Sequence, residues 1–365
     1  MRILLGTNHF QEVAGSELVI QEFAELFVHA GHEVVIAANF VGQPMQGMAA
    51  RAGVTTCLAS AELNALEFDL VMVINQIAPR LSYAASEAMR PATRFVFLHV
   101  DLNFTLSQPG LVHEPLLADE IWLHSKEAKD YFIGEGLPEE KVRLFHNAAP
   151  PRFWRPERKY REHPAHVAII SNHLPVELAG MAVLLREQGM TVTHYGRGGD
   201  TYGRIGPRAL LESDVVVSIG KTVPYCLASR TPVFLYDHFA GPGYLSAENF
   251  ERAAWFNFSG RCSRAPRSAE QLATELGEGY AGGVAFMQEL PDSQRGSYRL
   301  RPQLMKLLEH IEHTQPNAKR LEVLEAHRQA MRHEKALAEA AGMFYRMWHG
   351  AHLTVQRLKQ QLPSS

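Results

Sequence analysis

The stretch RILLGTNHFQEVAGSELVIQEFAELFVHAGHEVVIA, residues 2–37, contains a strand, a helix and a second strand in immediate succession. Residues 2–6 and residues 33–37 are short apolar runs of the kind that forms buried strands. Between them, residues 16–30 carry the apolar stripe of a helix that packs on a core. Its members are Leu18, Val19, Phe23, Leu26 and Phe27. Gly31 follows at the position where a left-handed backbone most often ends a helix. This order predicts a parallel sheet covered by helices on both faces.

The same alternation continues outward from this stretch and then stops. Further strands are predicted at residues 69–74, 93–99, 120–124 and 142–145, and a helix at residues 126–135. The alternation stops at residues 148–166, where four prolines lie among many charged side chains. Proline clusters of this kind mark loops and linkers. We therefore predict a domain boundary here.

A second alternation follows the boundary. Strands are predicted at residues 167–170, 191–195, 214–218 and 232–236, and helices at residues 175–188, 209–212 and 222–229. After residue 302 only helical patterns occur, at residues 321–341 and 344–362. A chain of 365 residues suits two domains of ordinary size. We predict an α/β fold with two tandem Rossmann-like domains, residues 1–150 and 165–300, and a helical tail, residues 301–365. The tail fits a surface helix, a coiled coil that makes a homodimer, or a helix on a membrane surface.

Composition excludes several classes of protein. The net charge of −3 gives no reason to expect a nucleic-acid partner. The 18 histidines are scattered, without paired metal spacing, so no metal site is predicted. The three cysteines lie far apart in the sequence, which indicates reduced thiols in a cytoplasmic protein. No apolar run is long enough to span a membrane, and the first residues lack the features of a signal peptide. We expect a soluble, cytoplasmic protein, with peripheral contact to the inner face of a membrane left open.

The loops that follow the strands are the places to look for a ligand, since open α/β sheets bind ligands at the carboxyl ends of their strands. The first such loop ends in Gly15 and Ser16, just before a helix. Backbone N–H groups at a helix start can face a phosphate or a sugar hydroxyl. In the alternative interpretation, Ser16 caps the helix and Gly15 permits the turn. The loop is not GxGxxG, which argues against a dinucleotide-binding oxidoreductase.

The loop at Gly220, Lys221 and Thr222 lies between a buried strand and a helix. Gly220 lets the backbone approach a ligand, and the helix starts with its positive dipole end at this loop. Lys221 is suited to neutralise the growing negative charge of a diphosphate leaving group. The alternative is a plain helix start with a lysine in solvent.

A third loop, residues 236–244, is dense in glycine, aromatic and ionisable residues. Such a composition is costly unless the loop surrounds a ligand. Asp237 is predicted to orient His238 as a donor or base, and Gly241 to lie at the ligand. The alternative is an Asx-type turn with a hydrogen-bonded histidine.

Smaller candidates lie at other strand ends. Asn172 and His173 follow the first strand of the second half, and Gly196 follows the next strand. His99 and Asp101 follow a strand of the first half. A lone histidine at a strand end is more often structural than catalytic, but several ionisable groups at the strand ends argue together for a site.

With these motifs in view, residues 1–262 resemble the GT-B glycosyltransferases, and glycosyltransferase family 4 in particular. The start of the first helix at residues 14–17 is similar to the family's GGxE, and residues 30–34, AGHEV, to its RGHEV. Residues 118–147 resemble the family's ADxIIxxS and EKVxVIPNGVD passage, with Asn147-Ala148-Ala149 in place of Asn-Gly-Val. Residues 228–233, ASRTPV, resemble ACGTPV.

The resemblance implies a nucleotide-sugar donor held mainly by the second half, with His99 near the donor sugar and no separate cofactor. It implies a retaining, metal-independent mechanism without a protein nucleophile, in which stabilisation of the departing diphosphate and acceptor orientation matter most. The family has two glutamates eight positions apart, and this chain has Val217 and Tyr225 there. We expect the loops at Lys221 and Asp237 to replace that motif, with Arg261 as a second phosphate contact.

Three hypotheses on function follow. The first is a glycosyltransferase that transfers sugar to a glycan or a lipid-linked glycoconjugate, in bacterial surface polysaccharide synthesis. The second is a catalytically silent GT-B protein that acts as a binding module. The third, a sugar-nucleotide 2-epimerase, requires more carboxylates and histidines in the cleft than the sequence offers.

Overall fold

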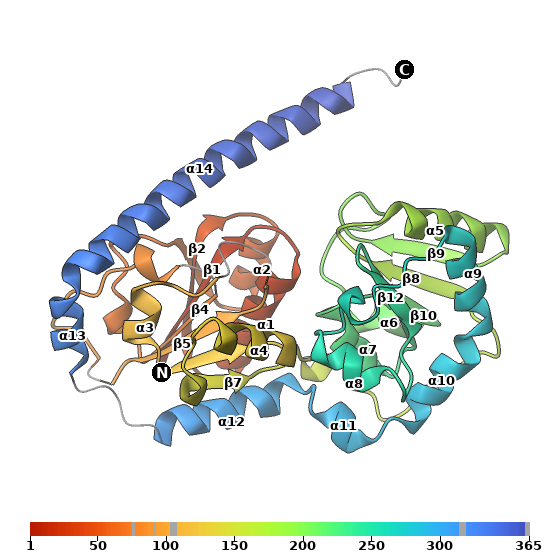
Figure 1. The fold of residues 1–365 in the computed structure, drawn as a ribbon, viewed down its shortest axis with the longest axis horizontal. Helices are drawn as coiled ribbons and strands as arrows, with labels where there is room; N and C mark the ends of the chain where they lie inside the picture. The colour runs from red at the N-terminus through yellow and green to blue at the C-terminus, as the bar shows by residue number, and fades with distance from the viewer. Residues whose placement is uncertain (75–76, 91, 103–107, 314–318, 362–365) are drawn as a thin grey trace. The chain divides into compact units, whose positions relative to one another are not determined.

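The predicted alternation of strands and helices forms two β-sheets in the computed structural model (Figure 1). The structure describes residues 1–74, 77–90, 92–102, 108–313 and 319–361. Within them, the first sheet has the strand order β3-β2-β1-β4-β5-β6-β7, and the second has the order β12-β11-β10-β8-β9. The predicted α/β class with two Rossmann-like halves and C-terminal helices is confirmed.

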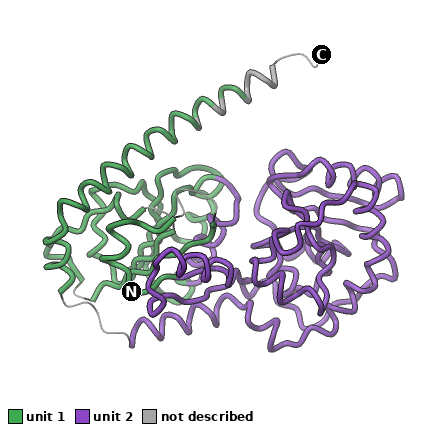
Figure 2. Tube along the Cα trace, viewed as in Figure 1, with its two compact units in different colours: residues 1–11, 27–121, 315–365 green, residues 12–26, 122–314 purple. Residues whose placement is uncertain are grey.

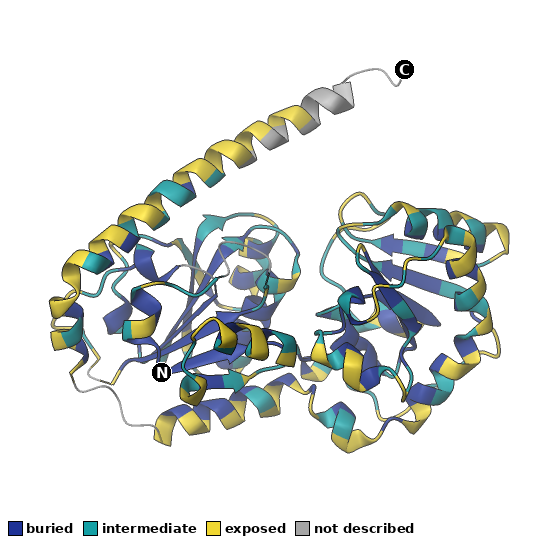
Figure 3. Cartoon of the chain, viewed as in Figure 1, coloured by how far each residue is buried: buried dark blue, intermediate teal, exposed yellow. Residues whose placement is uncertain are grey.

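The first sheet begins with the unit that decides the fold. Its strands are β1 (Arg2–Phe10), β2 (Glu33–Val41), β3 (Thr55–Leu58), β4 (Leu70–Ile74), β5 (Arg94–His99), β6 (Glu120–Leu123) and β7 (Val142–Leu144). Strand β1 pairs in parallel with both β2 and β4, with Leu4 opposite Val35 and Val71. Every residue of β4 and β5 is buried, as a parallel sheet covered on both faces requires (Figure 3).

Helix α1 (Gly15–His29) connects β1 to β2 as predicted. Val19, Phe23 and Phe27 of its apolar stripe are buried, and Gly31 beyond its end has φ +84°. The other helices before the boundary are α2 (Met45–Arg51), α3 (His113–Leu117) and α4 (Lys126–Gly134). Single-turn 3-10 helices are η1 (Ala65–Glu67), η2 (Ala78–Arg80), η4 (Glu139–Lys141) and η5 (Pro151–Phe153).

The second sheet has apolar side chains on both faces. Its strands are β8 (His166–Ile170), β9 (Thr191–Tyr195), β10 (Val215–Ser218), β11 (Val233–Asp237) and β12 (Ala240–Tyr244). Val216 belongs to the cluster on one face, and Val215 and Val217 belong to the cluster on the other. Strands β8 to β11 run parallel, so their carboxyl ends lie along one edge of the sheet.

Helices flank this sheet and continue to the end of the described chain. They are α5 (Val176–Glu187), α6 (Pro207–Glu212), α7 (Thr222–Ser229), α8 (Phe250–Trp255), the 3-10 turn η6 (Gly260–Cys262), α9 (Ala269–Glu278), α10 (Tyr280–Glu289), α11 (Asp292–Gly296), α12 (Leu300–His313), α13 (Arg320–Ala326) and α14 (Arg328–Gln361). The helical patterns predicted at residues 321–341 and 344–362 lie on α13 and α14, which are separated at His327, and α14 runs without interruption through Gly342. None of the helices within the described residues is both long and apolar enough to cross a membrane.

The chain divides into two compact units (Figure 2). The first unit contains residues 1–11, 27–121 and 315–365, and the second contains residues 12–26 and 122–314. The division therefore cuts through α1 and β6, and most of α1 belongs with the second sheet. The predicted domain limits at 150, 165 and 300 stay predictions.

Candidate functional site

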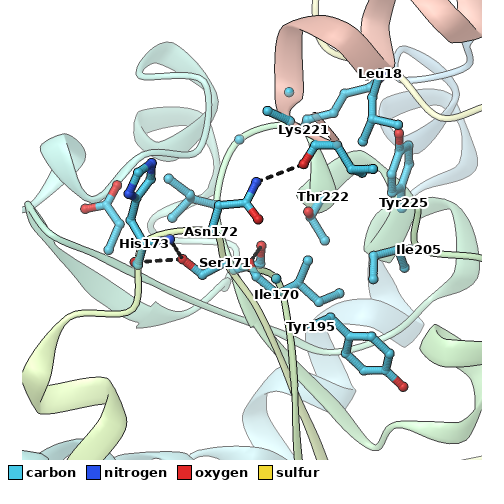
Figure 4. Close-up of a pocket in the computed structure, with 18 of the residues that line it drawn as sticks. Leu18, Ile170, Ser171, Asn172, His173, Tyr195, Ile205, Lys221, Thr222 and Tyr225 are labelled. Carbon is cyan, nitrogen blue, oxygen red and sulfur yellow. Dashed lines mark hydrogen bonds between the residues drawn. The ribbon is translucent and has the colours of Figure 1, made fainter. Parts of the chain in front are cut away.

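A cavity of about 270 Å³ lies at the carboxyl ends of β8 to β11, entirely within the second unit (Figure 4). Its wall comes from the four loops that follow these strands and from the entry to α1. This is the edge of an open α/β sheet where ligands bind. Nine of the predicted site residues line it: Gly15, Asn172, His173, Gly196, Gly220, Lys221, Thr222, Asp237 and His238.

The entry to α1 is held against the second sheet by the amide of Asn172. Its Nδ2 donates to the carbonyl oxygen of Val13 at 2.8 Å (Figure 4). Its Oδ1 accepts from the backbone N–H of Arg197 at 3.1 Å. The N–H of Val13 donates to the Tyr202 hydroxyl, and Glu12 pairs with Arg197. Asn172 therefore fixes one wall of the cavity through contacts within the protein.

Lys221 lies in the cavity wall and is only 9% exposed. Its Nζ lies 2.7 Å from the Glu22 carboxylate and donates to the carbonyl oxygen of Ala148 at 2.7 Å. The alternative of a solvent-exposed lysine is therefore wrong. Burial lowers the pKa of Lys221, while the Glu22 carboxylate opposes that shift. An ammonium has three N–H donors, so the contacts with Glu22 and Ala148 leave one donor for a ligand.

Glu22 is the centre of a buried charged cluster that the sequence analysis did not identify. Its carboxylate accepts from the Tyr225 hydroxyl at 2.7 Å and pairs with Arg152 at 2.9 Å and Arg204 at 3.3 Å. A buried carboxylate is stable only when it is paired and hydrogen-bonded. The available signal was the helical spacing of Leu18, Glu22 and Leu26, which puts a charge inside the apolar stripe.

The segment predicted as a ligand-binding loop at residues 236–244 is a β-hairpin. Strand β12 pairs antiparallel with β11, and His238 and Phe239 form the turn. The carboxylate of Asp237 accepts from the N–H of Phe239 at 2.6 Å, which is the Asx-type turn of the alternative interpretation. Its other oxygen accepts from Ser259 Oγ at 3.1 Å and from the N–H of Gly260 at 3.2 Å.

The hairpin therefore corrects two expectations. Both oxygens of Asp237 hold the turn and the neighbouring η6, so the carboxylate is not directed at His238 as predicted. Gly241 lies in β12 outside the described lining of the cavity. A Cβ on Gly241 would lie 2.1 Å from the carbonyl oxygen of Leu235, so close strand packing explains this glycine.

The glycines of the cavity wall fall into two kinds. Gly196 has φ +150°, and a Cβ there would lie 1.8 Å from the carbonyl oxygen of Ser171, so the backbone itself requires glycine. Gly15 has nothing within 4 Å of a built Cβ, and Gly220, at φ +54°, has only Asn257 at 4.0 Å. Gly15 and Gly220 therefore leave room beside the cavity.

Two more predicted residues of the second unit, Ser16 and Arg261, make contacts outside the described lining of the cavity. Ser16 donates to Glu17 at 2.8 Å, and neither side chain is in the described lining. Arg261, predicted as a phosphate contact, makes a two-bond pair with Glu127, at 3.1 Å and 2.7 Å. His173 is an exposed residue of the lining, next to Asn172.

His99 and Asp101 belong to the first unit. His99 ends β5, and its Nε2 lies 2.8 Å from the carboxylate of Glu114, with both side chains buried. The second oxygen of Glu114 accepts from the N–H of Gly110 at 2.8 Å. Asp101 is exposed, two residues beyond β5. His99 is thus held as a buried histidine–carboxylate pair.

Metal ligands do not gather in the described part of the chain: no group of three or more His, Cys, Asp or Glu side chains there could hold an ion. The expectations of metal independence and of no separate cofactor stay predictions. The titratable groups in the described lining of the cavity are Lys221, Asp237, His173, His238, Tyr195 and Tyr225. Their arrangement offers one lysine donor and two imidazoles to a ligand at the strand ends.

No family model and no curated protein matches this chain. Among solved structures, it is similar to HepE from Anabaena in complex with UDP-glucose, with a TM-score of 0.57 and 12% identity over 86% of this chain and 100% of that one. It is also similar to a glycosyltransferase from Rickettsia africae, with a TM-score of 0.52 and 12% identity over 85% and 97%. The resemblance to glycosyltransferase family 4 specifically stays a prediction. At these identities the similarity shows the fold: the chain has the two-sheet GT-B architecture.

Proposed function

We propose that this chain is a glycosyltransferase that binds a nucleotide-sugar donor in the cavity at the ends of β8 to β11 and transfers the sugar to a glycan or lipid-linked acceptor. The observation that carries the proposal is the position of the cavity, where four parallel strands end beside the start of α1. The UDP-glucose bound in HepE, a protein of the same fold, supports a donor of this class.

In this proposal the donor diphosphate lies at Gly220 and Lys221. Gly220 leaves room for the phosphates, and the remaining donor of Lys221 and the N-terminus of α7 stabilise the charge that grows on the leaving diphosphate. Another part of the donor occupies the space beside Gly15, where the backbone N–H groups at the N-terminus of α1 can bind it. His173 and His238 are the two histidines in the described lining of the cavity.

The finer points of the proposal rest on the resemblance to family 4. They are retention of configuration, metal independence, roles for His99 and Asp101 at the transferred sugar, and a place in bacterial surface polysaccharide synthesis. Since His99 is paired with Glu114, its role would be to donate one N–H while the carboxylate orients the ring.

Donor binding is tested by thermal shift with UDP-, GDP-, ADP- and CMP-sugars. A ligand that binds only the folded protein raises its melting temperature. A Cβ built on Gly15 meets nothing within 4 Å, so Gly15→Phe adds a ring to the cavity lining from a position with free space around the Cβ. The matched control is Gly134→Phe, on α4, where a built Cβ also meets nothing within 4 Å. We expect one donor to stabilise the wild type and the control but not Gly15→Phe; stabilisation of none, or of all three equally, contradicts the donor site.

A specific observation favours a second candidate, a silent binding protein. Asn172, Asp237 and Arg261, all predicted to hold the donor, are bonded within the protein. Hydrolysis of the stabilising donor in the absence of acceptor separates the two candidates. Release of free sugar, abolished by Gly15→Phe, supports the enzyme; binding without any release or transfer supports the silent protein.

A further inference from the structure

Helix α14 carries a row of exposed apolar side chains along its length. Leu337, Phe344, Trp348 and Val355 recur at intervals of seven, four and seven residues, which puts them on one side of a helix. Met347 lies next to this row. Phe344 is 63% exposed and Trp348 is 57% exposed. Apolar and aromatic side chains that remain exposed in a row mark a surface for interaction.

A different side of α14 faces the first unit. Met331, Glu334 and Gly342 are buried, and Glu334 accepts from the backbone N–H of Leu111 at 2.6 Å and of His113 at 2.8 Å. These contacts fix the first half of the helix on its own unit. The exposed apolar row lies outside this contact: its side chains are 48–66% exposed, and Trp348 also contacts the ring of Tyr345. Much of the surface of α14 is exposed (Figure 3).

Most of the exposed charged side chains of α14 are positive. Arg332 and Arg346 lie 14 residues apart on a third side, and Lys335 lies on the same side. After Glu339 the sequence has no Asp or Glu through residue 365, but it has Arg346, Arg357 and Lys359. This end of a chain with net charge −3 is therefore cationic.

A hollow of about 690 Å³ lies beside the start of α14 within the first unit. Arg332 and Lys335 line it together with apolar side chains such as Leu324 of α13. Arg328 also lines it, but is paired with Glu325. Cations beside an apolar wall suit a molecule with an anionic head and an apolar body.

We propose that α14 binds the surface of an anionic lipid bilayer. Exposed Phe, Trp, Leu and Met on one side, with Lys and Arg on another, are the features of a helix that lies in the membrane interface. A second copy of this chain fits less well, because two copies of the acid-free segment would bring cations together. An anionic surface attracts the same cations, by about fivefold in affinity for each Lys or Arg near it.

The test is flotation of the full chain with vesicles of phosphatidylcholine containing 30% phosphatidylglycerol and with pure phosphatidylcholine vesicles. We expect binding to the anionic vesicles, weakened by 0.5 M salt, because salt screens surface charges. Leu337→Gln/Phe344→Gln/Met347→Gln should weaken it by more than tenfold. The control Leu211→Gln/Val176→Gln/Val183→Gln changes three exposed apolar residues of the second unit and should bind like the wild type.

The contribution of the cations to vesicle binding is tested separately with Arg332→Glu/Arg346→Glu. At about fivefold in affinity for each cation, this double variant should weaken binding to the anionic vesicles by more than twentyfold. Its control is Arg301→Glu/Lys306→Glu, two exposed cations of α12. Circular dichroism confirms that each variant is folded. Equal loss in the controls, or no binding of the wild type to anionic vesicles, overturns the proposal. A wild-type dimer that the apolar triple variant converts to a monomer, without vesicle binding, assigns the row to self-association instead.

Discussion

Glu17 should make the protein less stable as the pH rises through the neutral range. It lies in the first turn of α1 and is 5% exposed. Burial raises its pKa from 4.5 to about 7, against the opposing hydrogen bond from Ser16. Between these two values the folded protein holds a proton that the unfolded chain has released. The stabilisation is therefore complete below pH 4.5 and is lost by about pH 7. The rise of the Glu17 pKa from 4.5 to about 7 corresponds to a loss of about 3 kcal/mol in the free energy of unfolding.

Glu17→Gln keeps the shape of the protonated side chain and cannot ionise. We expect the variant to match the wild type near pH 4.5 and to exceed its free energy of unfolding by about 3 kcal/mol at pH 8. Urea unfolding followed by circular dichroism at both pH values measures the difference. Glu62→Gln, a change at an exposed carboxylate, is the control and should give no pH-dependent difference. A variant that is less stable than the wild type at pH 8, or a difference independent of pH, refutes the reasoning.

Three further substitutions test contacts that shape the cavity and hold α14. Tyr225→Phe removes a hydroxyl that donates to the buried Glu22 carboxylate, and should cost about 2 kcal/mol in urea unfolding. Gly196→Ala forces a Cβ onto a carbonyl oxygen 1.8 Å away and should cost more than about 1 kcal/mol in the same assay. Burial raises the pKa of Glu334, but hydrogen bonds from His113 outweigh it and leave the pKa below 4.5. Glu334 thus stabilises α14 above pH 4.5 and loses this effect as the pH falls through its lowered pKa. Glu334→Gln should increase hydrogen exchange of α14 at pH 7 and less so at pH 3.5.

Each of these substitutions has a matched control at a position without the contact. Tyr131→Phe changes an exposed tyrosine of α4, and Gly206→Ala adds a Cβ that meets nothing within 4 Å. Glu339→Gln changes an exposed glutamate of α14. If a control variant is destabilised as much as the test variant with which it is matched, the contact removed in the test variant does not account for the loss of stability.

The fold could be predicted from the sequence because its local signals agree. The apolar runs, the stripe of α1 and Gly31 all indicate one strand–helix–strand unit, and the structure has that unit at residues 2–41. The hairpin of β11 and β12 was missed because glycine and proline are rare inside strands. Gly241 is nevertheless a strand residue, since only glycine fits against the carbonyl oxygen of Leu235.

The candidate site could be predicted only as a set of loops. Eight of the nine predicted residues in the lining are there because the parallel strands β8 to β11 bring their following loops to one edge, and the ninth, Gly15, comes from the entry to α1. The partners of these residues could not be predicted, since Glu22 and Arg204 meet across 182 positions of sequence. No local pattern encodes which carboxylate a buried Lys221 will meet. The same reason explains Arg261, whose partner Glu127 lies 134 positions away.

The central claim is that the cavity at the ends of β8 to β11 holds a nucleotide sugar. The most direct measurement is a crystal structure of the protein with the nucleotide sugar that stabilises it most. The account predicts electron density for the donor beside Gly15 and Gly220, with a phosphate oxygen within hydrogen-bond distance of Lys221 Nζ. Density for the donor at any other place, with this cavity unchanged from the ligand-free protein, would contradict it.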